Sequence, residues 1–113
     1  MDVSEIIKIL NANKSKNFVD RIINKENYPV IDLGNGDYAT HLMSWEEDNK
    51  GYYVYPNILY ENGKLVQRTG AEAVKAAKKA GEFIKFDNPT DADSFSKEYK
   101  KVWNDPMFEL GEP

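Results

Sequence analysis

The stretch GYYVYPNILY, residues 51–60, holds four of the seven tyrosines of the chain. Such a run is either a platform on which bases or sugars stack or the inside of a small sheet. Alternate side chains of a strand share a face, so Tyr53 and Tyr55 lie on one face and Tyr52 and Val54 on the other. Because both faces are apolar or aromatic, we predict that the rings are buried, with helices on one face and the N-terminal segment partly covering the other.

The charge around this stretch argues against a nucleic-acid partner. Residues 28–66, which include the tyrosines, carry two bases and six acids. Binding of nucleic acid rests largely on neutralised phosphates, and stacking of single strands needs a positive groove beside the rings. The alternative to burial is an exposed aromatic surface for another ligand or a protein partner, with Tyr53, Tyr55 and Tyr60 as its candidate residues.

The tyrosine stretch belongs to a series of short alternating segments separated by turn residues. These segments predict strands over residues 30–33, 38–45, 51–60 and 65–66. Tight turns between successive strands make the pairing antiparallel. Pro56 has no N–H to donate, which indicates an edge or a bulge at that point of the third strand.

Helical patterns flank the strands on both sides. Apolar stripes predict helices over residues 4–11, 18–24, 71–80 and 91–103. We expect Asp2 or Ser4 to cap the first helix, Gly81 to end the third, and Thr90 to cap the last. Residues 82–86 predict a short strand or an extended link. Together these elements predict an α+β fold, a three- to four-stranded antiparallel meander with helices packed mainly on one face.

Composition fits one small domain. The chain has 113 residues, of which 41% are hydrophobic and 30% charged, a net charge of −4 and no cysteine. The absence of cysteine excludes disulfides, thiolate metal sites and a cysteine nucleophile. Acids stand where a secretory signal carries bases, and no stretch approaches the roughly 18 apolar residues of a membrane span. We therefore expect a soluble acidic protein without a membrane role.

The candidates for chemistry are few. His41 is the single histidine, and alternation places it among apolar neighbours, as expected of a core residue; zinc needs three or four ligands. Glu46, Glu47 and Asp48 are expected in a solvated turn, although paired carboxylates are also what a glycosidase uses. Asp32, Asn35 and Asp37 offer too few oxygens for a calcium loop. The sequence thus predicts no catalytic residue, no metal and no cofactor.

Two helices carry clusters of lysine. These are Lys75, Lys78 and Lys79 in the third helix, and Lys97, Lys100 and Lys101 in the last. If the two helices pack side by side, all six lysines form one patch for an acidic partner. The alternative is two solvated faces, balanced by acids of the same helices.

Residues 16–104 resemble a small domain carried by bacteriophage and prophage proteins. The resemblance rests on the proline-led strand, the Gly-Asn-Gly turn and the Thr-His-Leu-Met at residues 40–43. It also rests on the Tyr-Pro of the aromatic strand, on Ala-Gly-Glu-Phe-Ile at residues 80–84, and on FSKEYKKVW at residues 95–103. The resemblance implies a phage origin and a binding or structural role, without catalytic residues. Residues 1–15, an N-terminal helical extension, and residues 105–113, an acidic tail, lie outside it.

These observations lead to three functional hypotheses. The first is a non-enzymatic, virion-associated phage protein that works by protein–protein contact. The second is a small phage inhibitor of a host defence or transcription protein, found in the bacterial cytoplasm. The third is a cell-wall-binding accessory domain of a lytic system, which would use the tyrosine strand.

Overall fold

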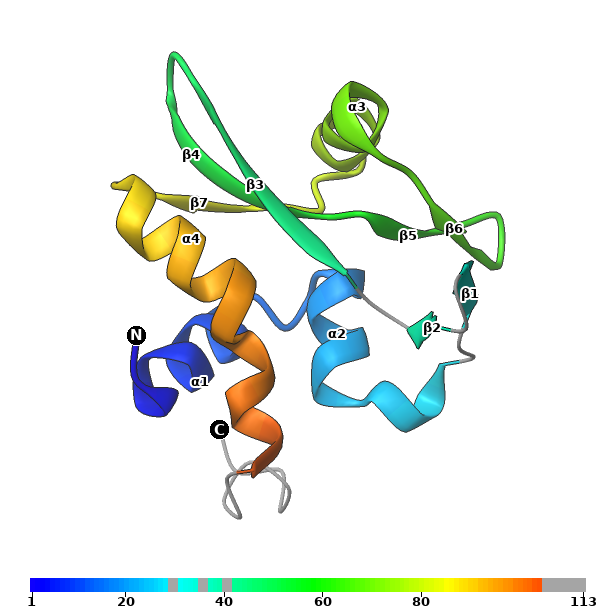
Figure 1. The fold of residues 1–113 in the computed structure, drawn as a ribbon, viewed down its shortest axis with the longest axis horizontal. Coiled ribbons are helices and arrows are strands. Elements are labelled where there is room, and N and C mark those ends of the chain that lie inside the picture. Colours follow the sequence, from blue (N-terminus) through cyan, green and yellow to red (C-terminus); the bar gives the residue numbers. More distant parts are fainter. Residues whose placement is uncertain (29–30, 35–36, 40–41, 105–113) are drawn as a thin grey trace.

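Residues 1–28, 31–34, 37–39 and 42–104, the part of the chain that the computed structural model describes, adopt an α+β fold (Figure 1). The α-helices are α1 (Val3–Ala12), α2 (Asn17–Ile23), α3 (Gly70–Ala80) and α4 (Pro89–Glu98), with 3-10 helices η1 (Lys25–Asn27) and η2 (Tyr99–Asn104). The strands are β1 (Ile31–Gly34), β2 (Asp37–Ala39), β3 (Met43–Asp48), β4 (Gly51–Pro56), β5 (Ile58–Glu61), β6 (Lys64–Gln67) and β7 (Ile84–Phe86). The α+β prediction is confirmed, and the break between α1 and α2 is present.

Strand β4 is the centre of the largest sheet, in which the order is β3-β4-β7 and every pairing is antiparallel. Strand β7 inserts beside β4 from the C-terminal third of the chain, so this sheet is not a simple meander. The pairs β1-β2 and β5-β6 form two further two-stranded antiparallel sheets. The antiparallel pairing was predicted correctly, but the pairing of β7 with β4 was not predicted.

The predicted strand over residues 51–60 is in fact two strands, which separate at Asn57. β7 pairs with β4 only as far as Val54, so Pro56 has a single neighbour, Met43 of β3. Asn57 then turns the chain, because its N–H donates to the carbonyl of Leu42 at 2.7 Å and its own carbonyl accepts from the N–H of Arg68 at 2.7 Å. Proline is tolerated here because no strand pairs with β4 on the β7 side at this position, so the missing N–H breaks no hydrogen bond there.

The two faces of the β3-β4-β7 sheet are covered by different helices. α1, α2 and α4 lie on one side of it and α3 lies on the other (Figure 1). Val54 faces the three-helix side and joins a core with Ile6, Phe18 and Phe95, each of which is fully buried. Three of the four described α-helices thus share one face, as predicted.

The second face differs from the prediction. Helix α3, and not the N-terminal segment, covers Tyr55. Ala73 and Ala77 of this helix pack in the same buried cluster as the tyrosine. These alanines are fully buried and small, which lets the helix axis come close to the tyrosine ring. Helix α1 instead adds Ile6 and Leu10 to the main core, so residues 1–15 are an integral part of the packed domain.

The helix ends combine predicted and unpredicted caps. Asp2 Oδ1 accepts from the N–H of Glu5 at 2.9 Å, and Gly81 ends α3 with a left-handed φ of 72°, both as expected. Thr90 does not cap α4: Asn88 Oδ1 accepts from the N–H of Asp91 at 2.8 Å. Pro89 causes the earlier start, because its fixed φ suits the first position of a helix.

A long-range contact caps helix α2. Its own preceding residue, Lys16, makes no side-chain cap, and the carboxylate of Glu82 takes that role. Glu82 accepts from the N–H of Asn17 at 3.1 Å and from the N–H of Phe18 at 2.8 Å. A negative charge at a helix N-terminus is stabilising, so this cap fastens the end of α3 to the start of α2.

A buried arginine connects α2 to β5. Arg21 is fully buried, and it donates from Nε to Asn17 Oδ1 at 3.0 Å and from Nη2 to the carbonyl of Ile58 at 2.6 Å. Burial lowers the pKa of Arg21 to about 10, against the opposing effect of the nearby Glu82 charge. The guanidinium therefore remains charged at neutral pH and acts as a structural tie between the two elements.

Candidate functional site

The β3-β4 hairpin carries the acidic residues singled out in the sequence. Glu46, Glu47 and Asp48 are the last three residues of β3 and are exposed, so their predicted place in a turn is wrong. The ladder continues to the pair Asp48 and Gly51, and Asp48 Oδ1 accepts from the N–H of Lys50 at 2.7 Å to close the turn. The hairpin projects past the end of β7 (Figure 1).

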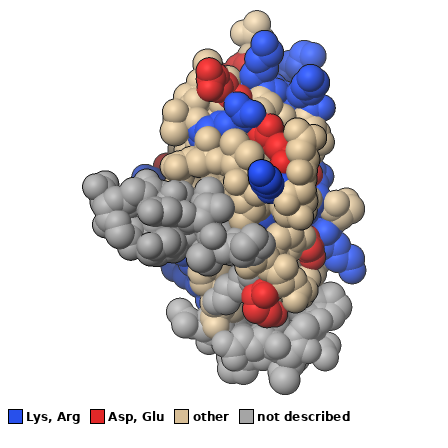
Figure 2. Space-filling model, turned by 90° about the vertical axis from the view of Figure 1, so that its right-hand side faces the viewer, with Lys and Arg blue, Asp and Glu red and all other residues tan. Residues whose placement is uncertain are grey.

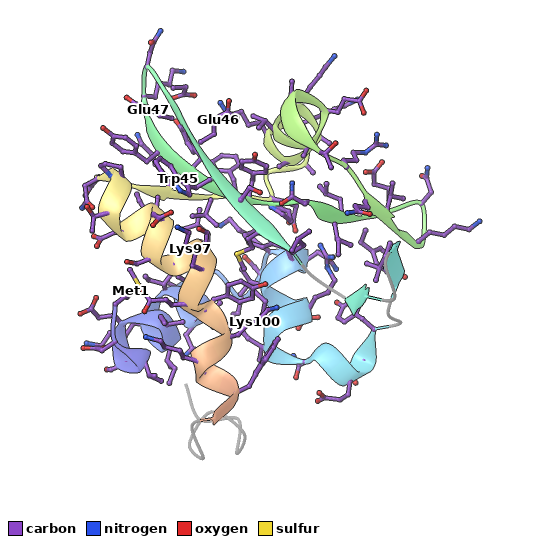
Figure 3. All side chains as sticks on the ribbon, viewed as in Figure 1. Met1, Trp45, Glu46, Glu47, Lys97 and Lys100 are labelled. Carbon is purple, nitrogen blue, oxygen red and sulfur yellow. The ribbon has the colours of Figure 1, made fainter. Side chains whose placement is uncertain are left out.

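Alternation along β3 sends neighbouring carboxylates to opposite faces. Glu46 lies opposite Tyr53 and shares the face covered by α3, whereas Glu47 lies opposite Tyr52 on the other face. Figure 3 shows the two side chains on opposite sides of the hairpin. Two adjacent glutamates therefore serve different surfaces of the molecule.

A cavity of about 100 Å³ lies between the hairpin and α3. Its apolar walls are formed by Tyr53, Tyr55, Val74 and Phe83. The ring of Tyr53 meets Phe83 edge to face, with the centroids 5.4 Å apart. Tyr53 and Tyr55 are only 8% and 7% exposed, so these rings are walls and not an open platform. The prediction that the tyrosines are buried is confirmed for these two residues.

The rim of the cavity is charged. Glu46, Glu47 and Asp48 of the hairpin and Lys78 of α3 border it, and of the three acids Glu46 and Asp48 lie on the α3 face. Lys78 Nζ lies 2.6 Å from Asp48 Oδ2 and 4.7 Å from the centroid of the Tyr53 ring. The ammonium is thus held by a carboxylate and by an aromatic face at the same time, an arrangement in which both attractions add.

Titration behaviour follows from these contacts. The hydrogen bond from Lys78, and then that from the backbone of Lys50, lowers the pKa of Asp48 below its ordinary value. The hydrogen bond with Asp48 raises the pKa of Lys78. Burial, and then the charge of Glu46, raises the pKa of Tyr55, which keeps its phenol neutral. At neutral pH the Asp48 and Lys78 pair is therefore charged and the Tyr55 phenol is neutral.

The tyrosine and lysine candidates are divided among several places. Tyr53, Tyr55 and Lys78 meet at the cavity between the hairpin and α3. Tyr60 and Lys79 line a separate hollow of about 530 Å³. Tyr60 is 45% exposed, and its ring meets that of Tyr28 at 6.0 Å.

The six lysines do not form one patch. Their two helices lie on opposite faces of the sheet, so the side-by-side packing that a common patch requires is not met (Figure 1). Lys97 pairs with Asp93 at 3.1 Å and Lys101 pairs with Glu98, while Lys75 and Lys100 are exposed. On the side of the molecule seen in Figure 2, basic side chains gather toward the upper end and acidic ones lie among them.

Several residues considered in the sequence fall outside this description. His41 and Asn35 lie outside the described residues, and only the backbone is described for Asp32 and Asp37, in β1 and β2. Within the described ranges, no group of three or more histidines or acids is placed to hold a metal ion.

The sequence did not indicate that Val74 and Phe83 belong to the site. It named Glu46 as a candidate carboxylate but did not place it with the tyrosines. Glu46 could have been found by placing the turn at Asn49 and Lys50, since that register sets it opposite Tyr53. The positions of Val74 and Phe83 depend on how α3 crosses β4, which no local pattern reveals.

No protein-family model, curated protein or solved structure matches this chain. None of the helices in the described ranges combines the length and apolar character needed to cross a membrane.

Proposed function

We propose that this chain is a non-enzymatic bacteriophage protein that acts by protein–protein contact as a component of the virion. The phage origin rests on the sequence resemblance of residues 16–104. The contact role rests on one structural observation, the small aromatic-walled cavity beneath a projecting acidic hairpin.

The size of the cavity supports contact with a protein and not binding of a free substrate. At about 100 Å³ it is smaller than the roughly 300–1,000 Å³ typical of small-molecule sites. A volume of this order suits one side chain of a partner. Anchor side chains that fill such pockets supply most of the binding energy at many protein interfaces.

The direct test is copurification with phage particles. An affinity-tagged chain, produced during infection, is expected to follow mature virions through a density gradient at a fixed ratio to the capsid protein. A tagged chain with Glu47→Lys and Glu46→Lys, which reverses the charge of the hairpin, is expected to remain with the free proteins. Wild-type protein that never enters the particle fraction would exclude the virion role.

The second candidate is a small inhibitor of a host defence or transcription protein. It is favoured by the exposed carboxylates of the projecting hairpin, because surface acids can occupy a groove that normally holds phosphates. A pull-down from uninfected host lysate should then recover one host protein in stoichiometric amount, and added DNA should compete with the capture. If DNA does not compete, the chain does not occupy a phosphate-binding groove of the host protein.

The cell-wall hypothesis has less support. It needs an open aromatic surface on the tyrosine strand, whereas Tyr53 and Tyr55 are buried beneath α3. Tyr60 is the exposed tyrosine of this strand region. On this hypothesis the protein binds purified sacculi through Tyr60, and the Tyr60→Ala protein does not bind them.

A further inference from the structure

We infer that the cavity between the β3-β4 hairpin and α3 binds a basic side chain, arginine or lysine, of the protein partner. This inference rests on the proposed contact function and names the chemistry that the contact recognises. Three features of the site carry it, namely a cation already held there, an excess of negative charge and an apolar wall.

The first feature is Lys78, which shows that the site accommodates a cation. Its ammonium lies 4.7 Å from the Tyr53 centroid and 2.6 Å from Asp48 Oδ2. Arginine and lysine of a partner carry the same kind of charge and are attracted to the same kind of ring face. The side chain of Lys78 is 41% exposed, so the resident cation is not enclosed.

The second feature is the charge that Lys78 leaves uncompensated. The carboxylates of Glu46 and Asp48 lie on the α3 side of the hairpin, and the ammonium beside them, that of Lys78, is committed to Asp48. Among the described residues, neither Glu46 nor Glu47 has an ion-pair partner. Glu46 lies on the α3 side, beside Tyr55, whose pKa its charge helps to raise. A positive group that enters the cavity therefore meets an available carboxylate next to apolar walls.

The third feature is the wall on which the stem of a basic side chain can lie. Val74 and Phe83 face the cavity together with the buried rings of β4. Lysine and arginine bury their methylene groups against apolar surface while the charged end stays at a polar rim. The cavity has this division, with an apolar floor and a carboxylate rim, and the charge and shape of a basic side chain complement it.

The probe for this inference is N-acetyl-arginine amide, observed by its effect on the NMR signals of the protein. The expected shifts concentrate on the ring signals of Tyr53, Tyr55 and Phe83. N-acetyl-citrulline amide has nearly the same shape without the charge, and it should cause much smaller shifts. Equal shifts with both amides, or shifts scattered over the whole surface, would overturn the inference.

Two substitutions are expected to change probe binding in opposite directions. Glu46→Gln removes the available carboxylate and should weaken binding roughly two- to five-fold, the range of an exposed ion pair. Lys78→Met removes the resident ammonium, which leaves Asp48 and the Tyr53 face to the probe, and should strengthen binding. Glu26→Gln, an exposed glutamate on η1, is the matched control and should leave binding unchanged. Weaker binding of the Lys78→Met protein would contradict the cation site.

The same probe separates this inference from the proposed function. If wild-type protein enters the virion but does not bind the arginine probe, the contact function stands and the cation pocket is wrong. If the wild-type protein binds the arginine probe but never enters a particle, the pocket stands and the virion role is wrong. Thermal unfolding of Glu46→Gln should match that of the wild type, because this side chain is exposed.

Discussion

The two faces of strand β4 differ in what covers them. On one face Val54 is sealed, fully buried, in a core built from α1, α2, α4 and β7. On the other face Tyr53 and Tyr55 are covered by α3 and by Phe83, which follows that helix, and a cavity remains beside them. Adjacent residues of one strand thus belong to a closed core and to an incompletely filled layer.

Polar groups sharpen this contrast. On the sealed face, the carboxylate of Asp93 is engaged twice, by Trp45 Nε1 at 2.9 Å and by Lys97 at 3.1 Å. On the α3 face, Glu46 has no ion-pair partner among the described residues. The sealed face thus holds a packed core with a doubly engaged carboxylate, and the α3 face holds a cavity with the Glu46 carboxylate beside it.

The largest predicted effect comes from opening the sealed face. Phe95→Ala removes a fully buried ring that packs on Phe86 at 5.5 Å and on Tyr99 at 6.4 Å. We expect the free energy of unfolding, measured in urea, to fall by about 4 kcal/mol, because a closed core cannot collapse around the missing ring. A loss below about 1 kcal/mol would show that this face is not a closed core.

The corresponding change on the α3 face should cost less. Tyr55→Ala removes a ring that borders a cavity already present, so water can enter the enlarged space. We expect a loss of about 2 kcal/mol in the free energy of unfolding, roughly half that of Phe95→Ala. Equal losses for the two variants would erase the distinction between the faces.

A smaller effect is expected at the connection between the faces. Glu82 follows the C-terminal end of α3 and caps α2 with both carboxylate oxygens. Glu82→Ala should lower the free energy of unfolding by about 1 kcal/mol, as for loss of a helix cap. Glu26→Ala, which removes an exposed glutamate without a cap role, is the control and should have almost no effect.

The smallest predicted effect is a pH dependence confined to the hairpin. The folded state lowers the pKa of Asp48 below its ordinary 3.8, so the Lys78 contact stabilises the protein above that pH. This contribution is lost as the pH falls through the lower, folded-state pKa. Wild-type protein should therefore lose more thermal stability below pH 4 than Asp48→Asn does. Parallel pH profiles would show that the ion pair adds nothing to folding.

Short-range patterns were sufficient to predict much of the fold. Alternation in residues 51–56 placed Tyr53 and Val54 on opposite faces, and the apolar stripes located the helices. Asp2 and Gly81 were recognised as helix ends because a cap depends on residues only a few positions away. The candidate site was predicted in part, since Tyr53, Tyr55 and Lys78 were named but their common cavity was not.

The long-range arrangement could not be obtained in this way. Burial of apolar surface has no direction, so two amphipathic helices are equally suitable covers for either face of a sheet. Only packing of particular volumes, such as Ala73 and Ala77 against Tyr55, decides which helix fits where. The same packing brings Glu82 to α2, although 64 positions separate Glu82 from Phe18.

The sequence by itself determined a two-faced aromatic strand, the antiparallel turns, the helices and an acidic charge around the tyrosines. The tertiary structure alone decided that β7 lies beside β4, that α3 covers the tyrosines, and that a charged cavity remains between them. Local patterns follow from backbone geometry and side-chain alternation, whereas a cavity exists only where distant segments of definite shape fail to fill the space between them.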